Sequence, residues 1–140
     1  MEDILFKGKR VDNGEWVYGW VTTQHKRYSH GKVVTKIQSN TFGEGEYLVD
    51  TKTVERYIGL EDVNGKKIFS NDICFYDDKH YQVMCERDML GGYWAETGYL
   101  LVEKGYQYGI PFTDTIDDYF CVICAEVVGN IHDNPELMKV

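Results

Sequence analysis

The sequence lacks any apolar run long enough for a transmembrane helix, which needs about 20 mostly apolar residues. It also lacks the basic start and apolar segment of a secretory signal, since Glu2 and Asp3 follow the first methionine. Its 140 residues can bury a core without disulfides or a metal as staples. We therefore expect a cytoplasmic protein with no membrane partner.

A surplus of positive charge is missing as well. The chain has 15 Lys+Arg against 23 Asp+Glu, which gives a formal net charge of -8. Sequence-independent binding of phosphates depends on Lys and Arg, so nucleic acid is not the expected main partner. The local exception is the polar segment 24–31 with Lys26 and Arg27, which Lys32 follows directly.

What the chain does contain favours β structure. It has 11 Tyr, 3 Trp, 6 Phe and 14 Gly, only 2 Pro, and no long helical stripe of apolar residues. We predict a single domain over residues 1–140, all-β or mostly β. The expected architecture is a small, partly open SH3-like barrel with additional hairpins and a short C-terminal helical turn.

The first predicted element is a β-hairpin. Asn13 and Gly14 lie between the strand-like segments 4–10 and 15–22, and Asn-Gly suits a two-residue hairpin turn. Side chains alternate along a strand. One face of the second strand therefore carries Trp16, Tyr18 and Trp20, and the other carries Val17, Gly19 and Val21.

Turn residues divide the rest of the chain into further short strands. The predicted strands are 32–38, 46–49, 53–58, 73–76, 81–86, 99–102 and 120–131. The segment 105–111 is predicted to be a loop, and 113–119 a single helical turn. Asn134 is placed to cap a last helical turn that begins at Pro135.

The four cysteines offer a weak signal for chemistry. Cys121 and Cys124 have the C-x-x-C spacing of redox dithiols and zinc ligands. They lie in a strand-like apolar run, where positions i and i+3 point to opposite faces, and Cys74 and Cys85 do not form a second pair. We interpret all four as structural thiols and expect no cofactor and no metal.

Neighbouring carboxylates are the other candidate for catalysis. Asp77-Asp78 with His80, and Asp117-Asp118, could hold a divalent cation or act as general acid and base. Aspartates are, however, common turn formers, and neither pair matches a calcium loop. A metal-dependent hydrolase using Asp77, Asp78 or His80 is therefore our second alternative, and no catalytic residue is assigned.

The aromatic residues are the main candidates for binding. Aromatic side chains commonly fill the cores of small β proteins, but exposed ones form contact surfaces for proteins or bases. The residues that we single out for binding are Trp16, Tyr18, Trp20, Tyr57, Lys26 and Arg27. Further aromatic candidates are Tyr93, Trp94, Tyr106 and Tyr108.

Three stretches, at both ends and in the centre, carry a family resemblance. Residues 4–19 contain a strand followed by an Asn-Gly-x-Trp hairpin, 57–73 contain Gly-Leu and Asn-Gly before Asp72-Ile73, and 127–137 end in Asn134-Pro135-Glu136-Leu137. In this order they resemble the YopX family of bacteriophage and prophage proteins. Ser70-Asn71 stands where that family has Glu-Gly, and Cys74 replaces a Val. Asn71 tolerates the left-handed backbone better than most residues.

The resemblance implies a phage-encoded protein working in the cytoplasm of a bacterial host, and it carries no activity over. The signature residues are turn and cap formers, which specify a fold better than a reaction. We expect a non-enzymatic accessory protein that binds a phage or host protein or self-associates into a homo-oligomer. The first alternative is a nucleic-acid-binding small β barrel.

Overall fold

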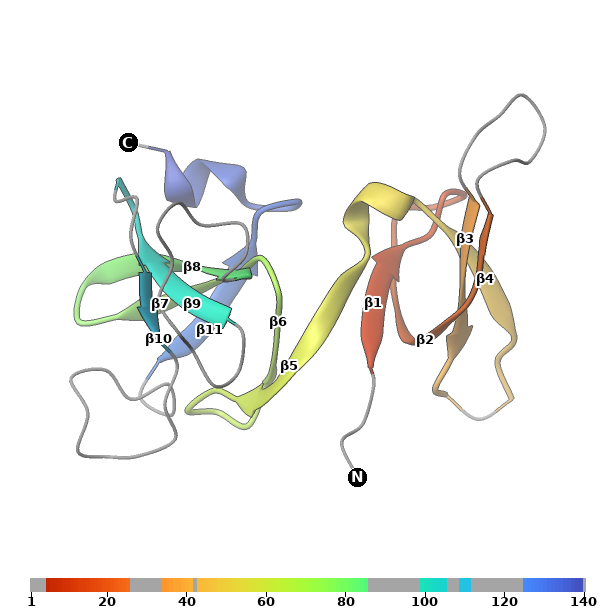
Figure 1. Cartoon of the computed structure of the whole chain (residues 1–140), viewed down its shortest axis with the longest axis horizontal. Helices are drawn as coiled ribbons and strands as arrows, with labels where there is room; N and C mark the ends of the chain where they lie inside the picture. The colour runs from red at the N-terminus through yellow and green to blue at the C-terminus, as the bar shows by residue number, and fades with distance from the viewer. Residues whose placement is uncertain are drawn as a thin grey trace. The chain divides into compact units, whose positions relative to one another are not determined.

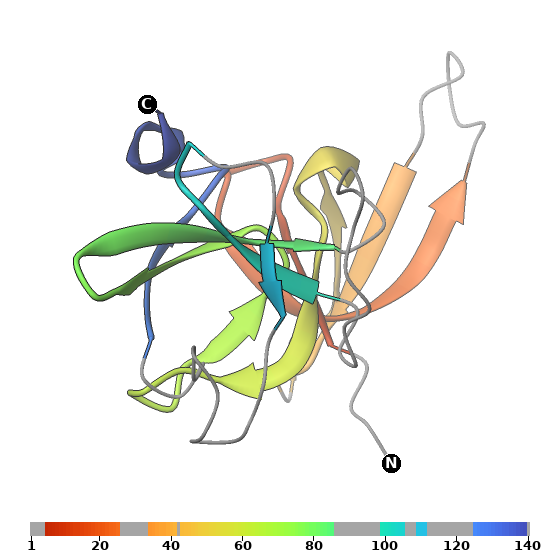
Figure 2. The same ribbon diagram turned by 60° about the vertical axis from the view of Figure 1, so that its left-hand side comes forward.

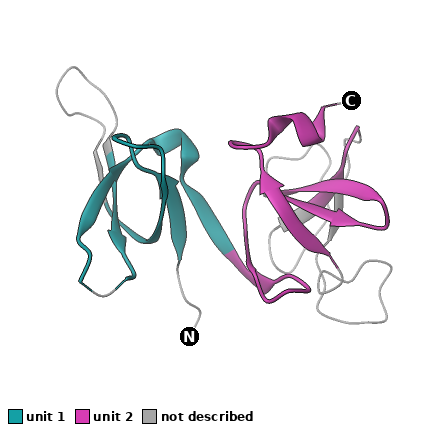
Figure 3. Ribbon diagram, turned by 180° about the vertical axis from the view of Figure 1, so that it is seen from behind, with its two compact units in different colours: residues 1–57 teal, residues 58–140 magenta. Residues whose placement is uncertain are grey.

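The computed structural model describes residues 5–25, 34–41, 43–85, 99–105, 109–111 and 125–139. They form antiparallel strands and two short 3-10 helices, so the prediction of a mostly β protein is confirmed (Figure 1). The chain divides into two compact units, Met1–Tyr57 (unit 1) and Ile58–Val140 (unit 2), which Figure 3 shows in different colours. The expectation of one domain over residues 1–140 stays a prediction.

Unit 1 is a curved antiparallel sheet in the order β4-β3-β2-β1-β5. Its elements are β1 (Phe6–Lys9), β2 (Trp16–His25), β3 (Val34–Ser39), β4 (Glu46–Val49), the 3-10 turn η1 (Thr51–Thr53) and the first residues of β5 (Glu55–Glu61). Val17, Ile37 and Val49 form the buried core of this unit. Each belongs to a different strand, and all three lie on the inner face of the sheet.

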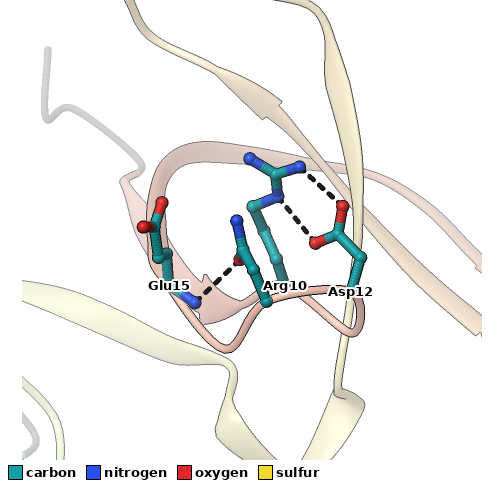
Figure 4. Close-up of polar contacts among 4 residues, drawn as sticks. Arg10, Asp12 and Glu15 are labelled. Atoms are coloured by element: carbon teal, nitrogen blue, oxygen red, sulfur yellow. Dashed lines mark hydrogen bonds and ion pairs between the residues drawn. The ribbon is translucent and has the colours of Figure 1, made fainter.

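The predicted first hairpin is confirmed, but its turn is longer than expected. Lys9 pairs with Trp16, and the Arg10 N–H donates to the Glu15 carbonyl at 2.9 Å. Four residues, 11–14, therefore form the loop, and among its residues only Gly14, with a φ of 73°, has a left-handed backbone. The Asn13 side chain accepts a hydrogen bond from the Glu15 N–H, which stabilises the longer turn (Figure 4).

The end of the hairpin covers the edge of unit 1's sheet. Arg10 forms a β-bridge with Val49, the Val11 N–H donates to the Leu48 carbonyl at 3.1 Å, and the Asp50 N–H donates to the Lys9 carbonyl at 2.8 Å. These contacts join the end of β1 to β4. The described strands form two antiparallel sheets, and no closed barrel forms among them.

Unit 2 contains a second antiparallel sheet in the order β10-β9-β8-β7-β11 (Figure 2). After the end of β5, its elements are β6 (Lys67–Phe69), β7 (Asp72–Tyr76), β8 (Lys79–Cys85), β9 (Tyr99–Glu103), β10 (Gly109–Pro111), β11 (Glu126–Asn130) and η4 (Pro135–Met138). The buried residues of its core are Ile58, Ile68, Cys74, Tyr81, Val83, Leu101, Ala125 and Val127.

Several predicted elements need correction. Residues 109–111 form a strand on β9 within the predicted loop 105–111. The strand predicted from residue 53 begins at Glu55, because Asp50 caps the 3-10 turn η1 through the Lys52 N–H. The last turn does begin at Pro135, but the Asn134 side chain accepts from the Asn130 N–H instead of capping it. The predicted helical turn 113–119 and strand residues 120–124 lie outside the described residues.

Candidate binding face

The outer face of unit 1's sheet is the surface opposite its core. Tyr18 and Trp16 of β2 pair in register with Lys7 and Lys9 of β1. Cross-strand partners share a face of the sheet, and so do alternate residues of a strand. The outer face therefore carries these four side chains and Trp20, while Val17 lies on the inner face.

Aromatic side chains on this face are open to solvent. Trp20 has 49% of its surface exposed and Tyr18 41%, while Trp16 is half-buried. Tyr57, also half-buried, follows Glu55 by two residues, and Glu55 pairs with Lys7, so Tyr57 shares the outer face. The structure thus brings together the four aromatic residues that the sequence singled out. Lys26 and Arg27 lie outside the described residues, as do Tyr93, Trp94, Tyr106 and Tyr108.

Two lysines that the sequence did not single out flank Trp16. The ammonium nitrogen of Lys7 is 4.5 Å from the centroid of the Trp16 ring, and that of Lys9 is 5.4 Å away. Both distances lie within the range of cation–π attraction. The two lysines therefore hold the indole in place, Lys7 from a buried position and Lys9 from a half-buried one.

The opposite border of the outer face is formed by β3 and β4. Trp20 pairs with Gln38, and Lys36 pairs with Leu48, whose surface is 42% exposed. The Lys36 ammonium lies 3.9 Å from a Glu46 carboxylate oxygen, and the Thr22 hydroxyl donates to the other oxygen. An aromatic centre is thus bordered by charged and polar groups, as in many protein contact surfaces.

The carboxylates of Asp77 and Asp78, the candidates for catalysis, lie in a turn of unit 2. Tyr76 and Lys79 form the last pair of the β7–β8 hairpin, so Asp77 and Asp78 are its two-residue turn, with φ values of 51° and 62°. Both aspartates are exposed, and the nearby His80 ring lies edge-on to Phe75 at 5.1 Å. Within the described ranges, no group of three or more His, Cys, Asp and Glu is arranged to hold a metal.

Cys74 is a buried thiol in the core of unit 2. Burial, together with the negative charges of Asp72 and Asp62, raises the pKa of this thiol to about 12. A thiol that stays protonated is a poor nucleophile and a poor metal ligand. Cys74 therefore has the structural role that we expected, while Cys121 and Cys124 lie outside the described residues.

Asp62 connects two distant parts of unit 2. One carboxylate oxygen accepts hydrogen bonds from the N–H groups of Asn64 and Lys66, at 2.9 and 2.8 Å. The other accepts from the N–H of Val127 in β11 at 2.9 Å. Burial alone would raise the pKa of Asp62, but these three donors outweigh it and the pKa is lowered. Asp62 thus fixes the Asn64-Gly65 turn to β11.

Other residues of the family-like stretches also have structural roles. Asn71 has a φ of 62°, the left-handed backbone expected where the family has Gly. The Asn130 side-chain oxygen accepts from the N–H groups of His132 and Asp133, and its amide donates to the Asp133 carboxylate. Buried Asp72 accepts from the Phe69 N–H at 2.8 Å. These side chains stabilise turns.

The family-like stretches were compared with known proteins. The family model described as YopX protein matches residues 5–139, nearly the whole chain and both units. No curated protein matches the sequence. Among the described residues, no helix is long and apolar enough to cross a membrane. The chain belongs to the YopX family.

Proposed function

We propose that this protein is a non-enzymatic binding module that contacts a protein partner through the outer face of unit 1. The observation that carries this proposal is the exposure of Trp20 and Tyr18 on one strand, beside half-buried Trp16 and exposed Leu48. Tryptophan and tyrosine are enriched among the residues that contribute most to protein–protein binding. Burying them against a partner would remove a large apolar surface from water.

Two of the edge strands, β4 and β11, already carry hydrogen bonds along their outer edges, which supports binding through side chains. The outer edge of β4 already receives hydrogen bonds from the Lys9–Val11 segment. At the start of β11, the carbonyl of the preceding Ala125 accepts from the Val63 N–H, and the Val127 N–H donates to the Asp62 carboxylate. Partners that add a strand need unpaired edge groups. A partner is therefore expected on the aromatic face and not at these two edges.

The proposal also includes where the protein acts. The family resemblance supports an accessory role of a phage or prophage protein in the cytoplasm of its bacterial host. A non-enzymatic role is supported by the turn-forming function of Asp77 and Asp78 and by the high pKa of the Cys74 thiol. The residues that resemble the family most closely are used in turns, which is consistent with binding by a separate surface.

The test compares three baits in infected host cells. The wild-type protein is tagged alongside a face variant, Tyr18→Thr with Trp20→Thr, and a control variant, Val63→Thr, which changes an exposed side chain of unit 2. Threonine keeps β-propensity at exposed strand positions. We expect a partner protein that the wild type and the control retain and the face variant loses. Equal retention by all three baits would contradict the proposal.

A further inference from the structure

Each unit carries one exposed Asn-Gly step. Asn13-Gly14 lies in the first hairpin loop of unit 1, and Asn64-Gly65 lies in the turn before β6 of unit 2. Asparagine is a thermolabile residue. Its side-chain amide is attacked most easily when glycine follows, because no Cβ hinders the approach of the next backbone nitrogen. Both steps are therefore candidates for deamidation, a chemical modification of the chain.

The two asparagine side chains differ in their hydrogen bonds. The Asn13 side-chain oxygen accepts from the Glu15 N–H at 3.0 Å, which holds this amide in one position. Among the residues that the structure describes, none is hydrogen-bonded to the Asn64 side chain, while the Asn64 backbone N–H donates to the Asp62 carboxylate at 2.9 Å. The Asn64 amide can therefore rotate toward the backbone nitrogen of Gly65.

The two glycines are placed alike. A Cβ added to Gly14 or Gly65 would have no atom within 4 Å, so space is open at both. The Gly14 N–H donates to the Arg10 carbonyl at 2.9 Å, and the Gly65 N–H donates to the Asp62 carbonyl at 3.0 Å. Each of these bonds must open before its nitrogen can attack, and this requirement applies to both steps. The difference between the sites therefore comes from the asparagine side chains.

We propose that Asn64 is deamidated in preference to Asn13 in the folded protein. The Gly65 nitrogen loses its proton and bonds to the side-chain carbonyl carbon of Asn64. The bond from that carbon to the amide nitrogen breaks, and ammonia leaves with the proton. Water then adds to either carbonyl of the resulting succinimide ring and opens it to aspartate or isoaspartate. The net reaction consumes one water and releases one ammonia, with no oxidation or reduction.

Deamidation of Asn64 would alter the turn that Asp62 fixes to β11. The Asp62 carboxylate accepts from the N–H groups of Asn64, Lys66 and Val127. Isoaspartate routes the backbone through the former side chain and lengthens it by one carbon, which displaces the Lys66 N–H from its acceptor. Either product also places a second negative charge beside Asp62. We therefore expect the modification to loosen the contact between this turn and β11.

The experiment follows both asparagines in one chain. The wild type is incubated at mildly alkaline pH, folded in one sample and unfolded in urea in another. Peptide mass spectrometry then quantifies aspartate and isoaspartate at positions 13 and 64. In the folded protein we expect Asn64 to convert several-fold faster than Asn13. In urea the two rates should be similar, because the bond from the Glu15 N–H to Asn13 is lost.

Asn64→Gln is the matched variant for the structural effect. Glutamine would have to close a larger ring and reacts much more slowly, and position 64 is exposed. After incubation, anion exchange separates the deamidated fraction of the wild type by its added charge. Hydrogen exchange of this fraction should show reduced protection of the peptide that contains Val127, whereas incubated Asn64→Gln should keep that protection.

Three results would contradict this inference. Asn13 could convert as fast as Asn64 in the folded protein, or Asn64 could stay intact over a period in which both asparagines convert in urea. Either result would overturn the assignment of the site. Unchanged protection of the Val127 peptide in the deamidated fraction would overturn its coupling to β11. The proposed function is judged separately by the comparison of baits, because the face variant lies in unit 1.

Discussion

Removing the Asp62 carboxylate is expected to destabilise unit 2 strongly. In Asp62→Ala, the N–H groups of Asn64, Lys66 and Val127 lose their acceptor. The bond to Val127 is buried, while the other two are partly buried and regain water more easily. A buried donor left unsatisfied costs about 1–3 kcal/mol, and each bond to a charged group contributes about 1.5–3 kcal/mol. With partial replacement by water, we expect a loss of about 3–5 kcal/mol.

Asp62→Asn is the matched, nearly isosteric variant. Its amide keeps one acceptor oxygen but replaces the other with an NH₂ group, which cannot accept the remaining N–H. We expect a smaller loss of about 2 kcal/mol at neutral pH. The folded-state pKa of Asp62 lies below its ordinary value of 3.8. Its stabilising effect is therefore complete above that value and is lost as the pH falls through the folded-state pKa. The difference between wild type and Asp62→Asn should narrow at acidic pH.

Urea unfolding followed by far-ultraviolet circular dichroism measures both effects, at neutral pH and in a series down to pH 3. Hydrogen exchange resolved by peptide assigns the change to unit 2, where the peptide that contains Val127 should lose most protection. A loss below 1 kcal/mol for Asp62→Ala, or a wild-type to Asp62→Asn difference that does not change with pH, would refute this account of Asp62.

Three further outcomes test particular residues. Gly19→Ala should prevent unit 1 from folding, because an added Cβ would lie 1.7 Å from the backbone oxygen of Gln38. In Gly14→Ala the added Cβ would have no atom within 4 Å, but the φ of 73° is unfavourable for alanine, so thermal unfolding should show a loss of about 1–2 kcal/mol. Cys74 should resist iodoacetamide at pH 8 until urea unfolds the protein, as mapped by mass spectrometry, because burial raises the pKa of its thiol to about 12. Asn71→Gly and Asn71→Ala both lose the hydrogen bond that the Asn71 side chain accepts from the Gln82 amide. By urea unfolding, Asn71→Ala should be about 1 kcal/mol less stable than Asn71→Gly, because only the alanine is strained at a φ of 62°.

The faces of the first hairpin were predictable even though its turn was not. A two-residue turn would place Tyr18 opposite Lys9, whereas the four-residue loop places Trp16 there. The two registers differ by two residues, and only an odd shift exchanges the faces of a strand. Alternation along β2 was therefore enough to place Trp16, Tyr18 and Trp20 together. The same alternation along β1 would have placed Lys7 and Lys9 beside them.

The boundary between the units had no clear signal in the composition. It falls inside β5, between Tyr57 and Ile58, where no Pro, Gly or Ser-rich linker marks it. The nearest indication is Gly59, whose φ of 92° interrupts an otherwise extended strand. Without the boundary, the difference in charge between the units could not be seen. The net charge of -8 is the sum of +1 for residues 1–57 and -9 for residues 58–140. Almost all of the acidic surplus therefore belongs to unit 2.

Contacts between residues far apart in the chain could not be predicted from the sequence either. Asp62 was visible as part of an Asn-Gly turn, but its bond to Val127 joins residues 65 positions apart. The short strand β10 depends on pairing with β9, because its three residues carry no alternating pattern of their own. Local preferences predicted turns and strands, whereas tertiary contacts decided these two features.

The central claim is that the outer face of unit 1 is the binding surface, and hydroxyl-radical footprinting tests it directly. Trp20 and Tyr18 should be oxidised readily in the free protein, whereas Tyr81, 5% exposed in the core of unit 2, should resist oxidation. In the complex with the captured partner, we predict several-fold protection of Trp20 and Tyr18. Equal oxidation of both side chains in the free and bound protein would contradict the claim.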